Sequence, residues 1–221
     1  MTDTTGRRAY RSDLRREQAE ATRRRIVDAA RPLLLERGYA AATMAEVAAA
    51  AGVAVQTLYA ACPGGKAGLA KLVYDVTLAG DARPIPQAER DEVRAIVEEP
   101  DPARKLELYA AMASGVAARI APLYQVLRAA EAAAPADAAL HDVLRRTDEE
   151  HRAGARGPAA HLSDVDALRP GLSVERAADQ IFALTSVDVY ARLTQLCGWT
   201  IDEYREWLAA TLRANLLAGY A

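Results

Sequence analysis

Apolar residues recur along most of this chain at the three- and four-residue spacing of amphipathic helices. In the first such segment they are Ile26, Ala29, Ala30, Leu33 and Leu34. The pattern predicts a helix over about 12–37, and Gly38 is placed to end it, because glycine readily adopts the left-handed conformation that closes many helices. Pro32 lies inside this helix and should bend its axis, since proline removes one backbone hydrogen bond.

Two short helices are predicted directly after the first. Thr43 followed by Glu46 forms a capping box, so one helix begins at Thr43, and Gly52 ends it. A second short helix follows over 54–61, and the turn CPGG breaks the chain again. A fourth helix then carries one apolar face, made of Leu69, Leu72, Val73 and Val76.

A second group of helices follows a linker at 81–86, which reads DARPIP and marks the expected domain boundary. Asp101 and Pro102 are a typical N-cap and first helical residue. Pro122 indicates either a new helix start or a kink, and Pro135 ends that segment.

The last part of the chain predicts three more helices. The first runs over about 137–153, and the Gly- and Pro-rich residues 154–172 are expected to form a broken or mobile connection. Ser173 caps the next helix, which Gly198 closes. The third opens with a capping box, TIDE, and has an apolar stripe formed by Ile201, Tyr204, Leu208, Leu212 and Leu216.

Composition agrees with an all-α fold and limits the class of protein. The 221 residues are 51% hydrophobic and 26% charged, alanine dominates the apolar residues, and strand patterns and long repeats are not found. No apolar run reaches the length of a membrane span, the N-terminus lacks a secretory pattern, and two cysteines make no disulfide framework. We therefore expect a cytoplasmic protein without membrane association.

Charge is distributed unevenly along the chain. Residues 1–71 hold 12 Lys and Arg against 7 Asp and Glu, a net of +5, whereas the remainder is net −7. Two short helices joined by a glycine turn after a longer helix are typical of a helix-turn-helix, in which the second helix enters the DNA major groove. The basic residues that precede this unit are Arg7, Arg8, Arg11, Arg15, Arg16, Arg23, Arg24 and Arg25. Solvated helix faces are the alternative explanation of these arginines.

At residues 22–69 the sequence resembles the TetR family of bacterial transcription regulators. The matching positions are Thr22, Ile26, Ala29, Ala30, Gly38, Tyr39, Thr43, Val47, Ala48, Ala51, Gly52, Val53, Thr57, Leu58, Tyr59, Lys66 and Leu69. The resemblance implies a basic arm and helix start at 1–19 and a three-helix DNA-binding domain at 20–80, with its motif at 43–62. A larger helical domain for effector binding and dimerisation would occupy 87–221.

The resemblance also implies which side chains contact DNA. They are Arg23, Arg24, Thr43, Val55, Gln56, Thr57, Tyr59, Ala60 and Lys66. Thr43, Tyr59 and Lys66 would contact phosphates, while positions 55–57 and 60 would face bases. A glutamine can pair with adenine, and a small apolar side chain can contact the thymine methyl group. A purely core aromatic is the alternative role for Tyr59.

Three positions depart from the family pattern. Ala54 stands where a serine usually caps the recognition helix, and loss of that cap costs about 1 kcal/mol. Cys62 stands where a phenylalanine is usual, and the turn before Lys66 has one residue more than the usual spacing. These departures favour, as an alternative function, a small-molecule-binding protein whose DNA binding is weakened.

Other chemistries find little support in the residues. The P-loop pattern fails on both sides of Lys66, because Ala60 and Ala67 occupy the required Gly and Ser/Thr positions. Cys62 is expected to be a small buried residue, and three histidines spaced ten apart do not form a metal site. We expect no cofactor, no metal and no catalytic residue, with an enzyme on a helical bundle the weaker alternative. Residues that could line an effector pocket or simply fill the core are Tyr109, Met112, Tyr124 and His151.

Together these patterns predict a homodimeric repressor that binds a palindromic double-stranded DNA operator and is released by a small-molecule effector. The helices at about 174–196 and 200–219 are expected to pair across the two-fold axis, as the resemblance implies. A purely intramolecular core is the alternative use of their apolar stripes.

Overall fold

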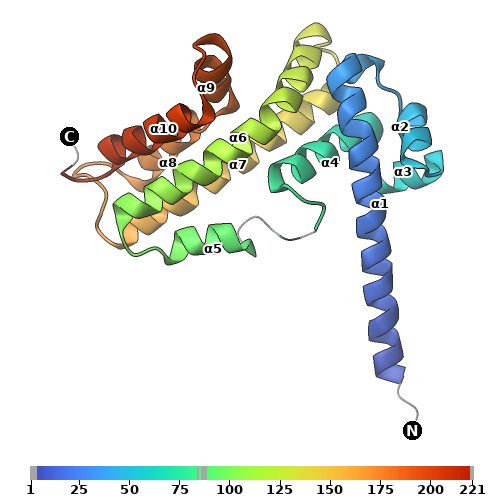
Figure 1. Cartoon of the computed structure of the whole chain (residues 1–221), viewed down its shortest axis with the longest axis horizontal. Helices are drawn as coiled ribbons and strands as arrows, with labels where there is room; N and C mark the ends of the chain where they lie inside the picture. Colours follow the sequence, from blue (N-terminus) through green and yellow to red (C-terminus); the bar gives the residue numbers. More distant parts are fainter. Residues whose placement is uncertain (1–3, 84, 86–88, 220–221) are drawn as a thin grey trace. The chain divides into compact units, whose positions relative to one another are not determined.

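The computed structural model describes residues 4–83, 85 and 89–219, with side chains from residue 17 onward, and its regular elements are helices (Figure 1). Within these residues the only extended pairing found is a single antiparallel bridge between Leu168 and Leu217. The all-α prediction is therefore confirmed. No single helix in the described ranges is long and apolar enough to cross a membrane, although the bent pair of helices Met44–Ala51 and Val55–Ala61 passes the same test of length and composition when taken together.

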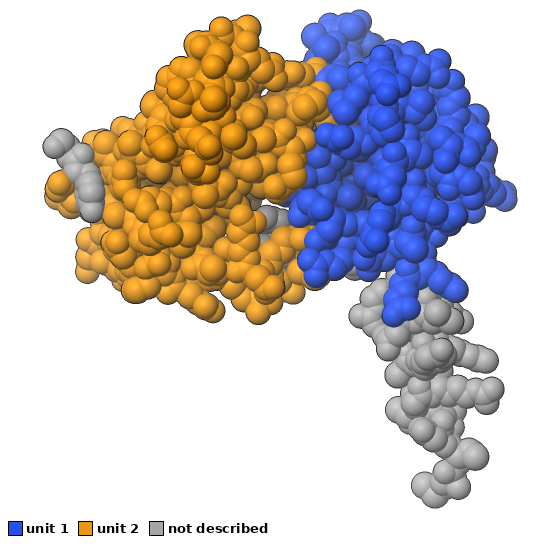
Figure 2. All heavy atoms as spheres, in the orientation of Figure 1, with its two compact units in different colours: residues 1–84, 126–140 blue, residues 85–125, 141–221 orange. Residues whose placement is uncertain are grey.

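The chain divides into two compact units (Figure 2). Unit 1 comprises Met1–Pro84 and Val126–Leu140, and unit 2 comprises Ile85–Gln125 and His141–Ala221. This division differs from the contiguous domains expected from the sequence. The segment Val126–Leu140 contains the end of one long helix and the start of the next, and it packs with the N-terminal helices. Unit 1 therefore includes a turn that is distant in the sequence from its other residues.

Unit 1 contains α1 (Thr4–Ala41), α2 (Met44–Ala51), α3 (Val55–Ala61) and α4 (Gly65–Ala79). Helix α1 packs against α2 and α4, and α2 packs against α3. Its fully buried side chains include Ile26, Leu34 and Leu58. Helix α1 begins earlier than predicted, and the expected break at Gly38 is confirmed by its non-helical φ of 79°, after which one more turn reaches Ala41.

Unit 2 contains most of the remaining helical residues. Its elements are α5 (Asp91–Glu98), the parts of α6 (Pro102–Ala133) and α7 (Ala138–Asp164) outside Val126–Leu140, α8 (Val174–Leu184), α9 (Val187–Ala191), the π-helical segment η2 (Arg192–Leu196) and α10 (Ile201–Leu216). Leu106 of α6, Ile181 of α8 and Leu208 of α10 are fully buried in one common core. Two of the predicted helix starts show their caps clearly: the Asp101 carboxylate accepts from the Ala103 N–H at 3.1 Å, and Thr200 forms its capping box.

The connection expected at 154–172 was predicted wrongly over its first half. Helix α7 continues through Pro158 to Asp164. Ala155, Ala159 and Leu162 lie on one face of this stretch and are fully buried in the unit 2 core. This burial stabilises the helix against the propensity of its glycines and proline. Pro122 likewise lies inside the continuous helix α6 rather than at a new start.

The single helix expected at about 174–196 is interrupted. Helix α8 ends at Leu184, and the next helix is capped by Ser186, whose side chain accepts from the Val189 N–H. The Thr185 hydroxyl donates to the Ile181 carbonyl at 2.7 Å, and the Tyr204 hydroxyl donates to the Leu184 carbonyl at 3.2 Å. Serine and threonine side chains compete for backbone groups in this way and so favour helix ends.

Candidate nucleic-acid interface

Helices α2 and α3 meet at a bend of 103°. The break between them is short because Gly52 adopts a left-handed conformation, with φ of 62°, and its N–H donates back to the Ala48 and Ala49 carbonyls. A pair of helices crossing at about 90–120° through a three- or four-residue turn is the geometry of a helix-turn-helix. The predicted motif is thus formed in the structure.

Thr43 fixes the start of α2. Its hydroxyl oxygen accepts from the Glu46 N–H at 3.2 Å, and the Glu46 carboxylate accepts from the Thr43 N–H at 3.0 Å. Arg37 pairs with the same carboxylate at 2.5 Å. The hydrogen bonds from Thr43, followed by that from Arg37, lower the pKa of Glu46 to about 2. The capping box is confirmed, while a phosphate contact by Thr43 stays a prediction.

Helix α3 has a buried face and an exposed face. Leu58 is fully buried and Cys62 follows one turn later at 1% exposure, which anchors the helix to unit 1. The opposite surface carries every α3 residue that was predicted to face DNA. These exposed residues are Val55, Gln56, Thr57, Tyr59 and Ala60. Tyr59 is 52% exposed, so it is not an ordinary core aromatic.

The two departures in α3 have different consequences. Ala54 provides no side-chain cap, so the start of α3 lacks the hydrogen bond that a serine would supply. Cys62 is buried, and this burial raises the pKa of its thiol to about 11. The expectation of a small buried residue at position 62 is therefore confirmed.

Lys66 is held against its own unit. Its Nζ donates to the Ala40 carbonyl oxygen at 2.7 Å and lies 4.8 Å from the centre of the Tyr39 ring. Burial lowers the pKa of Lys66, while the Asp137 and Glu46 carboxylates act in the opposite direction. The ammonium group is thus engaged with the last turn of α1, and its predicted phosphate contact stays a prediction.

The two arginines predicted to contact DNA lie in different surroundings. Arg24 is exposed and pairs with Glu20 at 3.2 Å. Arg23 is half-buried, its Nε finds no hydrogen-bond partner among the described residues, and its charge lowers the pKa of Cys62 against the effect of burial. The side chains of the arginines at 7–16 lie outside the described residues.

Sequence reasoning missed Gly68, which sets how closely α4 approaches the preceding turn. A Cβ at this position would lie 2.0 Å from the Pro63 carbonyl oxygen and 2.8 Å from the carbon of the same group. Both are backbone atoms, so only glycine fits without moving the chain. The available signal was a glycine in the interior of a predicted helix, where it is otherwise unfavourable.

Unit 2 brings together two of the four residues considered for an effector pocket. His151 Nε2 lies 2.9 Å from the Thr185 hydroxyl, and Tyr109 interacts with the same hydroxyl. The Tyr124 hydroxyl lies 3.5 Å from Asp148 instead, and Met112 packs against the core. No group of metal-binding side chains is found in the described part of the chain.

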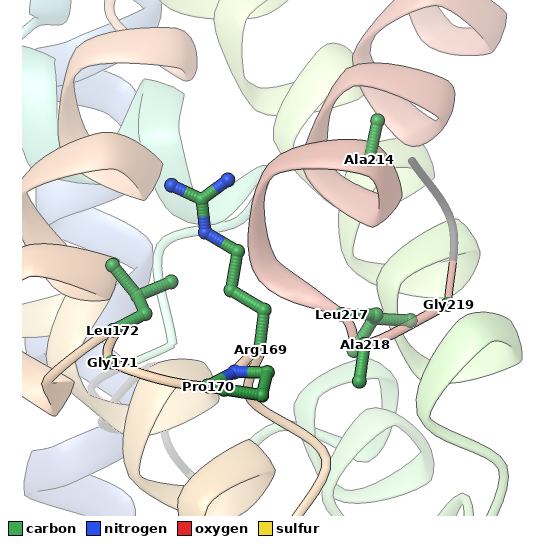
Figure 3. A pocket seen from close by; sticks show the side chains of 8 residues that line it. All are labelled: Arg169, Pro170, Gly171, Leu172, Ala214, Leu217, Ala218 and Gly219. Carbon is green, nitrogen blue, oxygen red and sulfur yellow. The ribbon is translucent and has the colours of Figure 1, made fainter.

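A surface cavity of about 540 Å³ lies elsewhere in unit 2, between the loop at 169–172 and the end of α10 (Figure 3). Its lining includes Arg169, Leu172 and Leu217. It shares no lining residue with the group around His151. None of the four candidates lines this cavity.

The sequence and the fold are similar to those of known proteins. Residues 26–71 match the sequence profile described as "Bacterial regulatory proteins, tetR family". No protein of curated function matches the sequence.

Solved structures extend the similarity over nearly the whole chain. One is NalD, the secondary repressor of the MexAB-OprM multidrug efflux pump in Pseudomonas aeruginosa, at 18% identity and a TM-score of 0.64 over 92% of this chain and 100% of that one. Another is FadR from Bacillus subtilis in complex with stearoyl-CoA, at 19% identity and a TM-score of 0.63 over 85% and 96%. A third is SmeT in complex with triclosan, at 15% identity and a TM-score of 0.65 over 91% and 94%. This chain has the fold of a TetR-family regulator.

Proposed function

We propose that this chain, whose residues 26–71 match the TetR-family profile, is a cytoplasmic, homodimeric transcriptional repressor that leaves its operator when a small molecule binds. The observation that carries the proposal is the exposed face of α3. It lies on a helix pair bent by 103°, and its side chains are free of the unit 1 core. Unit 1 would bind DNA, and unit 2 would bind the effector and the second copy.

The exposed residues of α3 would read the operator. Gln56 would pair with an adenine, and Ala60 would contact a thymine methyl group. Tyr59 would donate its hydroxyl to a phosphate, which fixes the position of the helix without reading sequence. Thr43, Arg23 and Arg24 would add contacts to the DNA backbone.

Features of unit 2 support a dimer and an effector. Leu196 is 80% exposed in the single chain, and Val189, Leu193 and Trp199, which are near it in the sequence, are only partly buried. This apolar surface would be covered by a second copy, whose recognition helix would reach a half-site about 34–36 Å away. NalD is named as a repressor, and FadR and SmeT were solved with small molecules bound. Binding of a ligand would favour a dimer that no longer matches this spacing.

Fluorescence anisotropy with labelled duplexes tests the DNA-binding proposal. The probe is the region upstream of the protein's own gene, with a random-sequence duplex as comparison. Gln56→Ala should relax discrimination at one base pair by about 1–3 kcal/mol, whereas Tyr59→Phe should weaken binding evenly on all sequences. Failure of the wild-type protein to prefer any upstream fragment at low salt would refute the proposal.

A second candidate function is a small-molecule-binding protein with weakened DNA binding. The observation that favours it is the engagement of Lys66 with Ala40 and Tyr39, together with the missing cap at Ala54. In that case the protein would bind the upstream and random-sequence duplexes with equal, low affinity. That affinity would depend on salt only as strongly as a few phosphate contacts require. The same titrations distinguish the two functions.

A further inference from the structure

The exposed face of α3 is uncharged. Residues 47–65 contain no charged side chain, so Glu46 and Lys66 are the nearest charges along the chain on either side of the helix. Glu46 is engaged by the cap of α2 and by Arg37. Lys66 donates to the Ala40 carbonyl. A recognition helix with this sequence brings no cation and no carboxylate of its own to the bases of a major groove.

The helical period gives each side chain of α3 its place on the helix. Leu58 is fully buried in unit 1. Gln56 and Ala60 are one turn apart and lie almost opposite Leu58, so they occupy the middle of the exposed face. Val55 lies at one edge of this face with 44% exposure, and Thr57 lies at the other edge. The middle of the face therefore consists of one amide group and one methyl group.

Tyr59 lies at an edge of the face, next to α4. A Cβ placed on Gly65, the first residue of α4, would be 3.6 Å from the Tyr59 ring, so the ring lies beside this turn. This position agrees with its proposed contact to a phosphate. The bases are then left to the four other exposed side chains of α3, and only two of these, Gln56 and Thr57, can form hydrogen bonds.

Each base favours a particular kind of side chain in the major groove. Guanine is read most often by arginine or lysine, and the cytosine amino group by a carboxylate, and α3 has none of these. Adenine pairs with glutamine. The 5-methyl group of thymine is the only apolar group that the four bases present there, and an apolar side chain contacts it. An alanine recognises this methyl group by burying it, without any hydrogen bond that would identify the rest of the base.

We propose that the α3 face selects pyrimidine 5-methyl groups through Ala60, so that each operator half-site is rich in A·T pairs and 5-methylcytosine replaces thymine at the contacted position. This inference rests on the proposed DNA-binding function and adds the chemical group that is selected. Gln56 and Ala60 are about 6 Å apart along the helix, close to two base-pair steps of about 3.4 Å. The adenine and the methylated pyrimidine therefore lie within about three base pairs of each other.

Removal of methyl groups from the DNA tests the inference. The probe is the upstream duplex that the protein prefers, synthesised with deoxyuridine in place of thymidine. Deoxyuridine keeps every hydrogen-bonding group of the base and lacks only the methyl group. We expect binding about three- to five-fold weaker for each contacted methyl group, the factor for burial of one such group. Replacement of guanine by 7-deazaguanine, which lacks the N7 acceptor, should leave the affinity unchanged.

Duplexes altered at single positions connect the methyl group to Ala60. Each thymine of the half-site is replaced in turn by cytosine and by 5-methylcytosine. At the contacted position the protein should bind 5-methylcytosine about three- to five-fold more tightly than cytosine, and this ratio should fall to about one in Ala60→Gly. Ala49→Gly, which removes an exposed side chain from α2, is the matched control and should keep the wild-type ratio. Each ratio compares two duplexes for one variant, so a change in helix stability affects both alike.

Equal affinity of the wild-type protein for the deoxyuridine and thymidine duplexes would overturn the inference. Weaker binding after the 7-deazaguanine replacement would overturn it too, because guanine would then be read in the major groove. If the methyl ratio persists in Ala60→Gly, or disappears equally in Ala49→Gly, Ala60 is not the residue that selects the methyl group. Failure of the wild-type protein to prefer any upstream fragment would instead refute the proposed function, before any methyl group is altered.

Discussion

Replacement of Gly68 by alanine should destabilise unit 1, although alanine is the better helix former. The added Cβ would lie 2.0 Å from the Pro63 carbonyl oxygen. Overpacking costs about 1–3 kcal/mol, and we expect the upper end because the obstructing atom belongs to the backbone and cannot rotate away. The gain in helix propensity offsets about 1 kcal/mol, which leaves a net loss of about 2 kcal/mol.

Gly154→Ala is the matched control. Gly154 also lies inside a helix, but an added Cβ there meets nothing within 4 Å. Without a clash, only the propensity term remains, so this variant should gain about 0.5–1 kcal/mol. The two substitutions are chemically identical and should have opposite signs.

The assay has to distinguish the two units. Both tryptophans, Trp199 and Trp207, lie in unit 2, so their fluorescence reports unfolding of that unit. Amide hydrogen exchange of peptides from α3 and α4 reports unit 1. Gly68→Ala should lower protection in those peptides, and Gly154→Ala should raise the fluorescence midpoint. If the amide protection of these peptides in Gly68→Ala equals that of the wild type, α4 does not approach Pro63 as closely as the structure shows.

Three further predictions concern the same unit and its buried thiol. Thr43→Ala should cost about 1 kcal/mol through loss of the cap. The pKa of Glu46 is lowered to about 2 in the folded protein, so the stability that its carboxylate contributes is present above about pH 4.5 and is lost as the pH falls toward 2. Thermal melts should therefore show that Thr43→Ala destabilises the protein less as the pH falls through this range. Leu58→Ala should cost about 2–5 kcal/mol in chemical denaturation, since this side chain is fully buried. A thiol reagent should modify the buried Cys62 only after unfolding, and rapid labelling of Cys62 in the native protein would contradict its burial.

Features set by residues close in sequence could be predicted from the sequence. Thr43 and Glu46 are three residues apart, and their capping box formed as expected. Gly52 ended its helix in the left-handed conformation for a local steric reason. The exposed face of α3 followed from the helical period, which places Leu58 inside and Tyr59 outside.

Features that depend on distant residues could not be predicted in the same way. Proline at 158 indicates a helix break, yet α7 continues because Ala155 and Leu162 are buried by other helices. The break after Leu184 is stabilised by Tyr204, whose hydroxyl satisfies the Leu184 carbonyl from 20 residues away. The contact between Asp137 and Tyr39 spans almost one hundred positions, and no periodicity in the sequence records it.

The turn before Lys66 is built on two glycines. Gly64 and Gly65 both adopt left-handed conformations, with φ of 89° and 64°, which only glycine tolerates at little cost. This pair forms the turn before α4, and the first turn of α4 brings Gly68 directly against Pro63. Lys66 then lies in the first turn of α4, where its side chain reaches Ala40. Lys66 therefore donates to a backbone carbonyl in the free protein, and a DNA phosphate would have to compete with that carbonyl for its ammonium group.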